Sequence, residues 1–247
     1  MTESTALSVT ARERWVYRLG GAAAAGVVLL VIGPAPVLVT NPIPTTVLGH
    51  INQMNDNKLV GLIDLDVAFA LSMILFVGLY VALFVALRRT NPVAATIGLG
   101  AGLASSVIYL AINPTLSFLY VSDQYAAATT DAQRAALLAA GEALWANYQG
   151  TGFAVAFVLS AVAILAFSVA MARSRTFNRW TAYIGLVLGV VMLVPPLPSF
   201  GTFGTIASYL SLLPLVVWNV LVAWRLFGLA AGQPAEQPKS MAVGRVS

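Results

Sequence analysis

The sequence predicts an all-α fold: a polytopic bundle of six transmembrane helices, with one amphipathic outer helix between spans 3 and 4. Three observations predict this fold class. Of the 247 residues, 59% are hydrophobic and only 9% are charged, whereas a soluble domain carries about 25% charged residues. Apolar runs of roughly 20 residues, which is the length that crosses a bilayer, recur along the chain. Residues 113–152, between the third and fourth runs, form the longest segment that is too polar for lipid.

Composition limits the chemistry and the partners of the chain. There are no cysteines, which excludes disulfides, thiolate catalysis and cysteine metal sites. The pI near 9.6 would suit nucleic acid, but the basic residues cluster beside the apolar runs, where membrane orientation explains them better. We therefore expect the lipid bilayer, and not nucleic acid, as the main partner. Arginine far outnumbers lysine and alanine is abundant, a composition typical of GC-rich bacteria.

The first apolar run, about residues 17–39, follows a polar cytoplasmic tail of residues 1–14. A basic start before an apolar run is also typical of a signal peptide. The run continues past the usual length of a signal-peptide core, so we predict an uncleaved first span. Pro34 and Pro36 should bend or end this helix, because each proline removes a backbone donor.

Residues 41–58 form the first outer connection. Apolar residues recur there at helical spacing and predict a short interfacial helix: Val47, Leu48, Ile51 and Met54. The lone His50 could be a ligand or a proton relay, but one histidine without a cysteine partner makes a poor metal site. We interpret it as an ordinary interfacial histidine without an evident partner.

The second span, about residues 63–87, begins with Asp64 and Asp66 and ends at Arg88 and Arg89. This is the charge order that a helix dipole prefers. The third span, about residues 93–112, follows an asparagine and a proline that are typical of a helix start. Small residues at four-residue spacing line one face of this span and allow close helix packing in lipid: Gly98, Gly102 and Ser106.

The outer segment contains a capping box from Thr130 to Gln133, which predicts a helix over residues 131–147. Its large apolar side chains fall on one side, and a few charged residues, among them Glu142, punctuate the rest. We interpret this amphipathic helix as lying on the membrane surface or folding over the mouth of the bundle.

Three further apolar runs complete the prediction, at about residues 153–171, 180–193 and 205–224. Gly185 and Gly189 repeat the four-residue spacing in the fifth span, which could extend to residue 197 before a proline cluster ends it.

Pro214 predicts a kink in the sixth span. The six-span domain therefore covers residues 15–228, and residues 229–247 form a polar cytoplasmic tail that we expect to be disordered.

Charge predicts the orientation of the chain. With both termini in the cytoplasm, only Lys58 and Arg134 of the 13 basic residues fall on the outer side. The basic residues of the inner side are Arg12, Arg14, Arg18, Arg88, Arg89, Arg173, Arg175, Arg179, Arg225, Lys239 and Arg245. The positive-inside rule predicts this asymmetry for six spans, and we place the protein in the cytoplasmic membrane of a bacterium.

No acidic, basic or histidine residue lies near the centre of any predicted span. Such buried charges mark proton relays and voltage sensors, so their absence counts against a proton pump, a voltage sensor and an intramembrane zinc hydrolase. The nucleophile elbow, HExxH and Walker motifs are also missing. We see no convincing internal repeat, which weakens an inverted-repeat transporter. We assign no catalytic, metal-binding or cofactor-binding residue.

Asp64, Asp66 and Glu142 are the candidate cavity residues. Because residues 67–87 already suffice to cross the bilayer, both aspartates lie near the outer interface. They are two residues apart and point to different helix faces; Asp64 shares its face with small residues and is the stronger candidate. The alternative is that both are simply acids favoured by the helix dipole, and that Glu142 is solvated or paired.

Short motifs run from the outer segment to the last span. They are Asn113-Pro114-Thr115-Leu116, residues 119–125, 132–137 and 140–143, Gly150-Thr151-Gly152-Phe153, residues 173–177 and 181–183, Trp218 and Trp224-Arg225-Leu226. Together they resemble a bacterial family of six-helix membrane proteins, catalogued only as a domain of unknown function, over about residues 15–228. Gln149 departs from the asparagine expected before Gly150. The resemblance implies a six-span fold and supplies no activity, cofactor or catalytic residue.

Two functional hypotheses follow, and a third is weaker. Small-residue packing without buried charge favours a non-enzymatic accessory, envelope-related or interaction protein with a protein partner. The alternative is a carrier of a small solute or lipid-like ligand, with Asp64, Asp66 and Glu142 lining an outward-facing cavity. The third is a membrane hydrolase that uses water activated by an acid.

Overall fold

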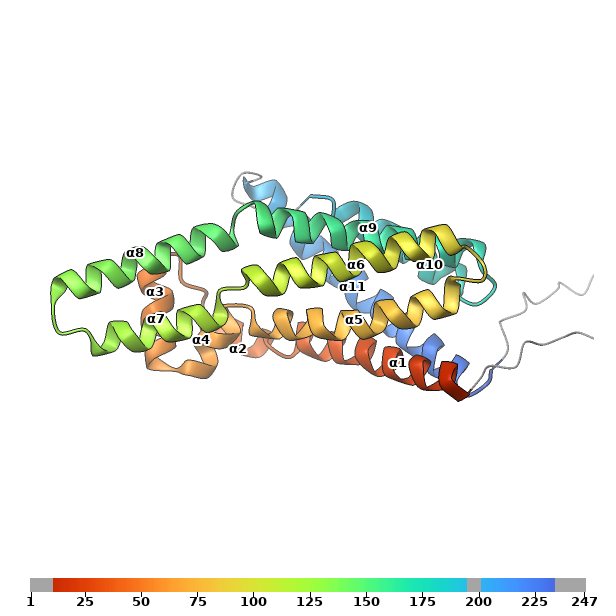
Figure 1. The fold of residues 1–247 in the computed structure, drawn as a ribbon, viewed down its shortest axis with the longest axis horizontal. Helices are drawn as coiled ribbons and strands as arrows, with labels where there is room; N and C mark the ends of the chain where they lie inside the picture. The colour runs from red at the N-terminus through yellow and green to blue at the C-terminus, as the bar shows by residue number, and fades with distance from the viewer. Residues whose placement is uncertain (1–10, 195–200, 234–247) are drawn as a thin grey trace, which may run out of the picture.

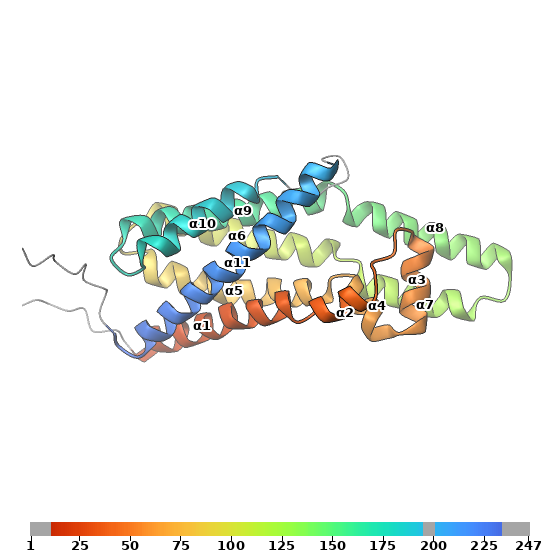
Figure 2. The same cartoon turned by 180° about the vertical axis from the view of Figure 1, so that it is seen from behind.

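The computed structural model describes residues 11–194 and 201–233, and all the regular structure in these residues is helical, as the sequence predicts. Six helices of the described residues form the bundle: α1 (Ala11–Ile32), α5 (Val67–Leu87), α6 (Pro92–Ile112), α9 (Thr151–Arg173), α10 (Arg179–Val191) and α11 (Gly201–Ala230). They pack in the order α1, α5, α6, α9, α10, α11 and back to α1. The helices therefore surround a common interior. α11 runs diagonally over the side of the bundle that faces the viewer in Figure 2 and lies at the back in Figure 1.

Five helical segments of the described residues are long and apolar enough to cross a membrane. They are Ala11–Thr40, Val67–Leu87, Pro92–Ala127, Asp131–Arg173 and Leu210–Ala230. The predicted fifth span corresponds to α10, an apolar helix of 13 residues that is shorter than these five. The fold is thus all-helical, with five to six long apolar helices compatible with a transmembrane bundle.

Two breaks in the chain shape the outer end of the bundle. The first span ends at Ile32, and the short α2 (Ala35–Thr40) follows Gly33-Pro34, where a bend was expected. The predicted second span is wrong at its start, because α4 (Lys58–Asp64) is separate from α5. Asp66 has a φ of 62°, in the left-handed region, and this backbone conformation ends the helical path between the two.

Beyond the bundle lies an outer helical domain made of α3 (Val47–Asp56), α4, α7 (Thr115–Ala127) and α8 (Asp131–Tyr148). Its own core contains Ile51, Met54, Leu65, Phe118 and Val121. The predicted interfacial helix is α3, and the predicted capping box is present at the start of α8.

The sequence analysis predicted one helix within residues 113–152, over residues 131–147, and the structure confirms it as α8. Residues 113–152 also contain a second helix, α7, which the sequence analysis missed. Pro114 suggested that the helical structure ends there, but only two residues separate the end of α6 from the start of α7. Figure 1 shows α7 and α8 running on from α6 and α9 as a hairpin beyond the bundle, not across its mouth.

The small residues of α6 and α10 lie at close helix contacts. A Cβ atom added to Gly102 would come within 2.4 Å of the Tyr80 ring, and one added to Gly98 within 2.9 Å of Phe167. On α10, a Cβ atom added to Gly185 would contact Ser168 and Trp218, and one added to Gly189 would contact Leu165. Ser106 on α6 is fully buried. Any larger side chain at these glycines would force the neighbouring helices apart.

Most of the predicted tails lie outside the described residues, namely 1–10 and 234–247, as does the proline cluster within residues 195–200. Within the described residues, α1 already begins at Ala11, and α11 begins at Gly201, contains Pro214 and continues to Ala230.

Candidate functional site

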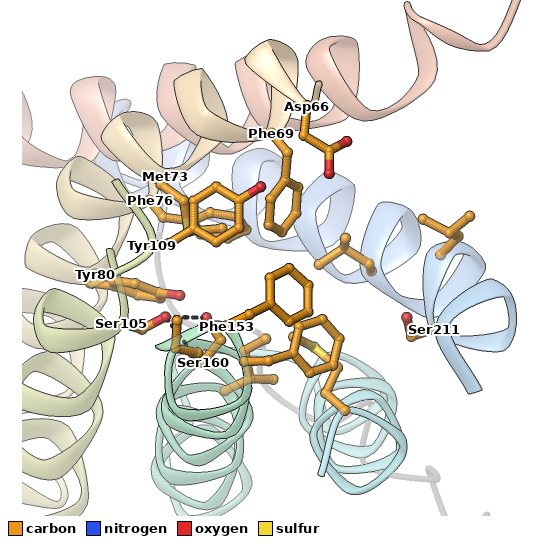
Figure 3. A pocket seen from close by; sticks show the side chains of 16 residues that line it. Asp66, Phe69, Met73, Phe76, Tyr80, Ser105, Tyr109, Phe153, Ser160 and Ser211 are labelled. Carbon is orange, nitrogen blue, oxygen red and sulfur yellow. Dashed lines mark hydrogen bonds between the residues drawn. The ribbon is translucent and has the colours of Figure 1, made fainter. Parts of the chain in front are cut away.

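A partly open cavity of about 270 Å³ lies inside the bundle, between α5, α6, α9, α10 and α11. Six aromatic rings line it: Phe69, Phe76, Tyr80, Tyr109, Phe153 and Phe157. On α5 the lining runs from Phe69 to Tyr80, a rise of about 16 Å along the helix. The cavity is therefore long and mainly apolar, as Figure 3 shows.

Polar groups lie at three places in the cavity wall: at Asp66, at the group of Tyr80, Ser105 and Ser160, and at Ser211. Asp66 is the only lining residue, among those described, with a charged side chain. Figure 3 shows Tyr80, Ser105 and Ser160 grouped together and away from Asp66. The Ser105 and Ser160 hydroxyls are 2.6 Å apart, and Ser105 also donates to the Ala156 carbonyl at 2.7 Å. This second group largely satisfies its own hydrogen bonds.

The backbone at Asp66 turns its side chain toward the cavity. Asp66 precedes the first residue of α5, the position where an aspartate commonly caps the helix, but its side chain makes no cap hydrogen bond. A left-handed conformation costs a residue with a Cβ about 1–2 kcal/mol, although aspartate tolerates it better than most. The Thr115 hydroxyl fixes the turn by donating a 2.5 Å hydrogen bond to the Leu65 carbonyl.

Two tyrosines form a hydrogen-bonded chain that ends on Asp66. The Tyr148 hydroxyl donates to Oδ2 of Asp66 at 2.8 Å, and the Tyr109 hydroxyl lies 3.1 Å from that of Tyr148. Because Tyr148 has only one hydroxyl hydrogen, Tyr109 must be the donor to Tyr148. The hydrogens of both tyrosines therefore point toward the carboxylate, from α6 through α8 to the start of α5.

The surroundings of Asp66 disfavour its charged form. Desolvation by the surrounding protein raises the pKa of the Asp66 carboxyl, the hydrogen bond from Tyr148 lowers it, and the negative charge of Asp64 raises it further. Asp66 is an exposed residue by surface area and lines a partly open cavity, so water screens part of this effect. Desolvation is still the largest cause of the raised pKa, and we expect the carboxyl to gain a proton more readily than a free aspartic acid.

Asp64 faces the outer helical domain and pairs with His50. Nδ1 of His50 on α3 lies 2.6 Å from Oδ2 of Asp64 on α4, and each side chain is only 1% exposed. The ring of Trp145 covers the histidine at a centroid distance of 4.6 Å, and Phe118 meets it edge-on. The expectation that His50 lacks a partner is thus wrong, because the facing sides of α3 and α4 bury it against Asp64.

A sequence signal for this pair did exist. Both His50 and Asp64 lie seven residues from Asn57, which ends α3 and whose side chain caps α4. An antiparallel helix pair around such a cap brings residues at equal distances from it together.

The structure thus separates the three acids that the sequence analysis grouped. Asp66 lines the cavity, Asp64 is buried with His50 on the other side of Leu65, and Glu142 is exposed on α8 and does not line the cavity. Sequence reasoning missed Tyr109 and Tyr148. No local pattern could have found them, because Tyr148 lies 82 residues from Asp66 along the chain.

The bundle of apolar helices and its long internal cavity define a helical membrane protein. The family model described as Domain of unknown function (DUF4386) matches residues 18–228, and the chain belongs to this family. This match confirms the resemblance to a domain of unknown function over most of the chain. Comparisons with curated proteins and with solved structures found no match.

Proposed function

We propose that this protein is a non-enzymatic membrane protein that binds a small, largely apolar molecule in the cavity of its bundle. The cavity itself is the observation that supports this proposal. Small-molecule sites are typically concave and apolar, with a few polar groups that fix the orientation of the ligand. Asp66 at one place and the hydroxyls of Ser105 and Ser160 at another fit this description.

The cavity favours the second hypothesis drawn from the sequence, a ligand carrier. This hypothesis is compatible with the first, a non-enzymatic accessory or envelope protein, because binding a small molecule requires no catalysis. The arrangement of the polar groups supports binding over catalysis. Ser105 and Ser160 bond to each other and to a backbone carbonyl rather than to a base, and His50 does not line the cavity.

For the membrane location, we propose the cytoplasmic membrane of a bacterium, with both termini in the cytoplasm and α10 as the sixth span. The distribution of the basic residues supports this orientation. A helix of 13 residues rises about 20 Å, less than the roughly 30 Å of a hydrocarbon core.

The natural absence of cysteine allows a clean test of this orientation. Single variants Asp123→Cys in α7 and Arg175→Cys after α9 can be labelled in intact cells with a maleimide that does not cross membranes. We expect labelling at position 123 and protection at position 175 until the cells are opened. The reverse pattern would contradict the proposed orientation.

Ligand binding is tested by filling the cavity. Ala156 lines the cavity and is 2% exposed, whereas the neighbouring Val155 is 41% exposed and does not line it. We expect native mass spectrometry of gently extracted protein to show a bound small molecule on the native chain and on Val155→Leu, but not on Ala156→Leu. A bound species that stays on Ala156→Leu, or none on the native chain, would contradict the proposal.

A further inference from the structure

We infer that the ligand of this cavity is a lipophilic ammonium ion, a molecule with one positive charge at one end and an elongated apolar body. The inference rests on the proposed function and names the class of ligand for the same cavity. Charge, hydrogen-bond direction and aromatic lining support it separately.

The charge of the cavity wall is not balanced by the protein. Among the described residues, the ion pairs join His50 to Asp64, Lys58 to Asp123, Glu13 to Arg88 and Arg89, and Arg134 to Asp131. None of them includes Asp66, whose carboxylate receives only the hydrogen bond from Tyr148. A carboxylate in a mainly apolar cavity wall, without a counter-ion, attracts a cation. A cation in the cavity would provide the missing charge.

The direction of the hydrogen bonds selects the same kind of ligand. Tyr109 donates to Tyr148 and Tyr148 donates to Asp66, so neither hydroxyl has a hydrogen left for a ligand. This end of the cavity therefore offers acceptors and negative charge, and few donors. An ammonium group has donors and a positive charge, whereas a carboxylate or phosphate ligand would be repelled.

Aromatic rings surround this acceptor end. Phe69 meets Tyr109 edge-on at a centroid distance of 5.0 Å, and Phe153 meets Tyr148 at 5.3 Å. Tyr109 and Phe153 also lie 6.1 Å apart, so the four rings form one cluster next to Asp66. Rings arranged beside a carboxylate favour cations through cation–π attraction, which is strongest where water is displaced.

The remaining wall suits an apolar tail. Met73, Phe76 and Phe157 line the cavity beyond the aromatic cluster, and the next polar groups are those of Tyr80, Ser105 and Ser160. The apolar lining of α5 before this second polar region, from Phe69 to Phe76, rises about 10 Å. The matching ligand has its charge at Asp66 and its apolar body along α5.

Two probes of nearly the same shape test the inference. Phenylbutylamine is protonated at neutral pH, and phenylbutanol replaces its ammonium group by an uncharged hydroxyl. Each is titrated calorimetrically into the native chain in nanodiscs of phosphatidylcholine, whose lipids carry no net charge. We expect the amine to bind about tenfold more tightly than the alcohol, or better.

Variants then assign this preference to one side chain. Asp66→Asn keeps an oxygen for Tyr148 but removes the charge, and should abolish the preference for the amine while the alcohol still binds. Asp123→Asn makes the same change at an exposed acid outside the cavity and should keep the preference.

Equal affinity of the native chain for the two probes would overturn the inference and leave ligand binding intact, and this comparison needs no variant to fold. A preference that persists in Asp66→Asn would also overturn it. Binding of neither probe would overturn it as well, and the mass spectrometry of Ala156→Leu decides separately whether the cavity binds any molecule.

Discussion

The Tyr148 hydroxyl donates a 2.8 Å hydrogen bond to the Asp66 carboxylate and thereby joins the last turn of α8 to the start of α5. Three residues earlier on α8, Trp145 covers His50 in the outer helical domain, and its ring lies 5.6 Å from that of Tyr148. One face of α8 therefore contacts both the core of the outer helical domain and the charged end of the cavity.

This hydrogen bond predicts how ligand binding depends on pH. The groups facing Asp66 are Tyr148 from α8, Tyr109 from α6 through Tyr148, and Asp64 from α4. Only the ionised carboxylate attracts a cation, so phenylbutylamine should bind less tightly as the pH falls through the raised pKa of Asp66. Tyr148→Phe removes a hydrogen bond that lowers this pKa, and should move the midpoint to higher pH.

Calorimetric titration at several pH values measures this midpoint. Tyr120→Phe serves as the control, because Tyr120 is 66% exposed on α7 and does not line the cavity. An unchanged midpoint in Tyr148→Phe would show that the hydroxyl does not influence Asp66.

Asp66 should also lower the stability of the empty protein at neutral pH. Desolvation in the folded protein raises the pKa of Asp66 above the usual value of an aspartic acid, so folding favours the protonated form. The resulting stability is fully present below the unfolded pKa and is lost as the pH rises through the folded pKa. We predict that Asp66→Asn raises the Tm in detergent slightly at neutral pH, because water at the exposed side chain screens part of the effect, and that this gain shrinks on acidification. A gain that does not depend on pH would point to packing instead of charge.

The His50–Asp64 pair should stabilise the outer helical domain as a unit. Removing one partner of a buried hydrogen-bonded pair leaves the other unsatisfied, which typically costs about 1–3 kcal/mol, or more for a charged group. We expect such a loss for His50→Phe and for Asp64→Leu alone. The double variant, with two apolar residues, should lose much less than the sum. Denaturant unfolding in detergent measures the coupling, and additive losses would show that the two side chains do not depend on each other.

Two glycines on α6 provide a matched test of the helix packing. A Cβ atom at Gly102 would lie 2.4 Å from the Tyr80 ring, whereas one at Gly100 would meet nothing within 4 Å. Gly102→Ala should therefore cost about 1–3 kcal/mol through overpacking. Gly100→Ala should be neutral or should stabilise the protein by up to about 1 kcal/mol, because alanine favours the helix. Equal Tm changes in the two variants would contradict this close contact between α5 and α6.

Sequence patterns predict the helices well where the signal is local. The capping box from Thr130 to Gln133 predicts the start of α8, and an apolar periodicity predicts α3. The break between α4 and α5 was not predictable, because it depends on the left-handed backbone of Asp66 and on a hydrogen bond from Thr115, which is 50 residues from Leu65.

The candidate site was predicted only in part for a related reason. Residue spacing shows that Asp64 and Asp66 point to different sides, but it ranks Asp64 first because its helical neighbours are small. The structure places Asp64 with His50 and leaves Asp66 at the cavity. Which of the two aspartates lines the cavity depends on the distant helices that pack against each of them. A single sequence does not show that Tyr109 and Tyr148 lie next to Asp66.

The most direct test of this account is a cryo-EM structure of the native chain in phosphatidylcholine nanodiscs with phenylbutylamine. The account predicts density for the amine inside the bundle, with its nitrogen about 2.7–3.2 Å from a carboxylate oxygen of Asp66 and its ring toward Tyr80. An empty cavity at a saturating concentration, or an amine bound with its nitrogen away from Asp66, would contradict it.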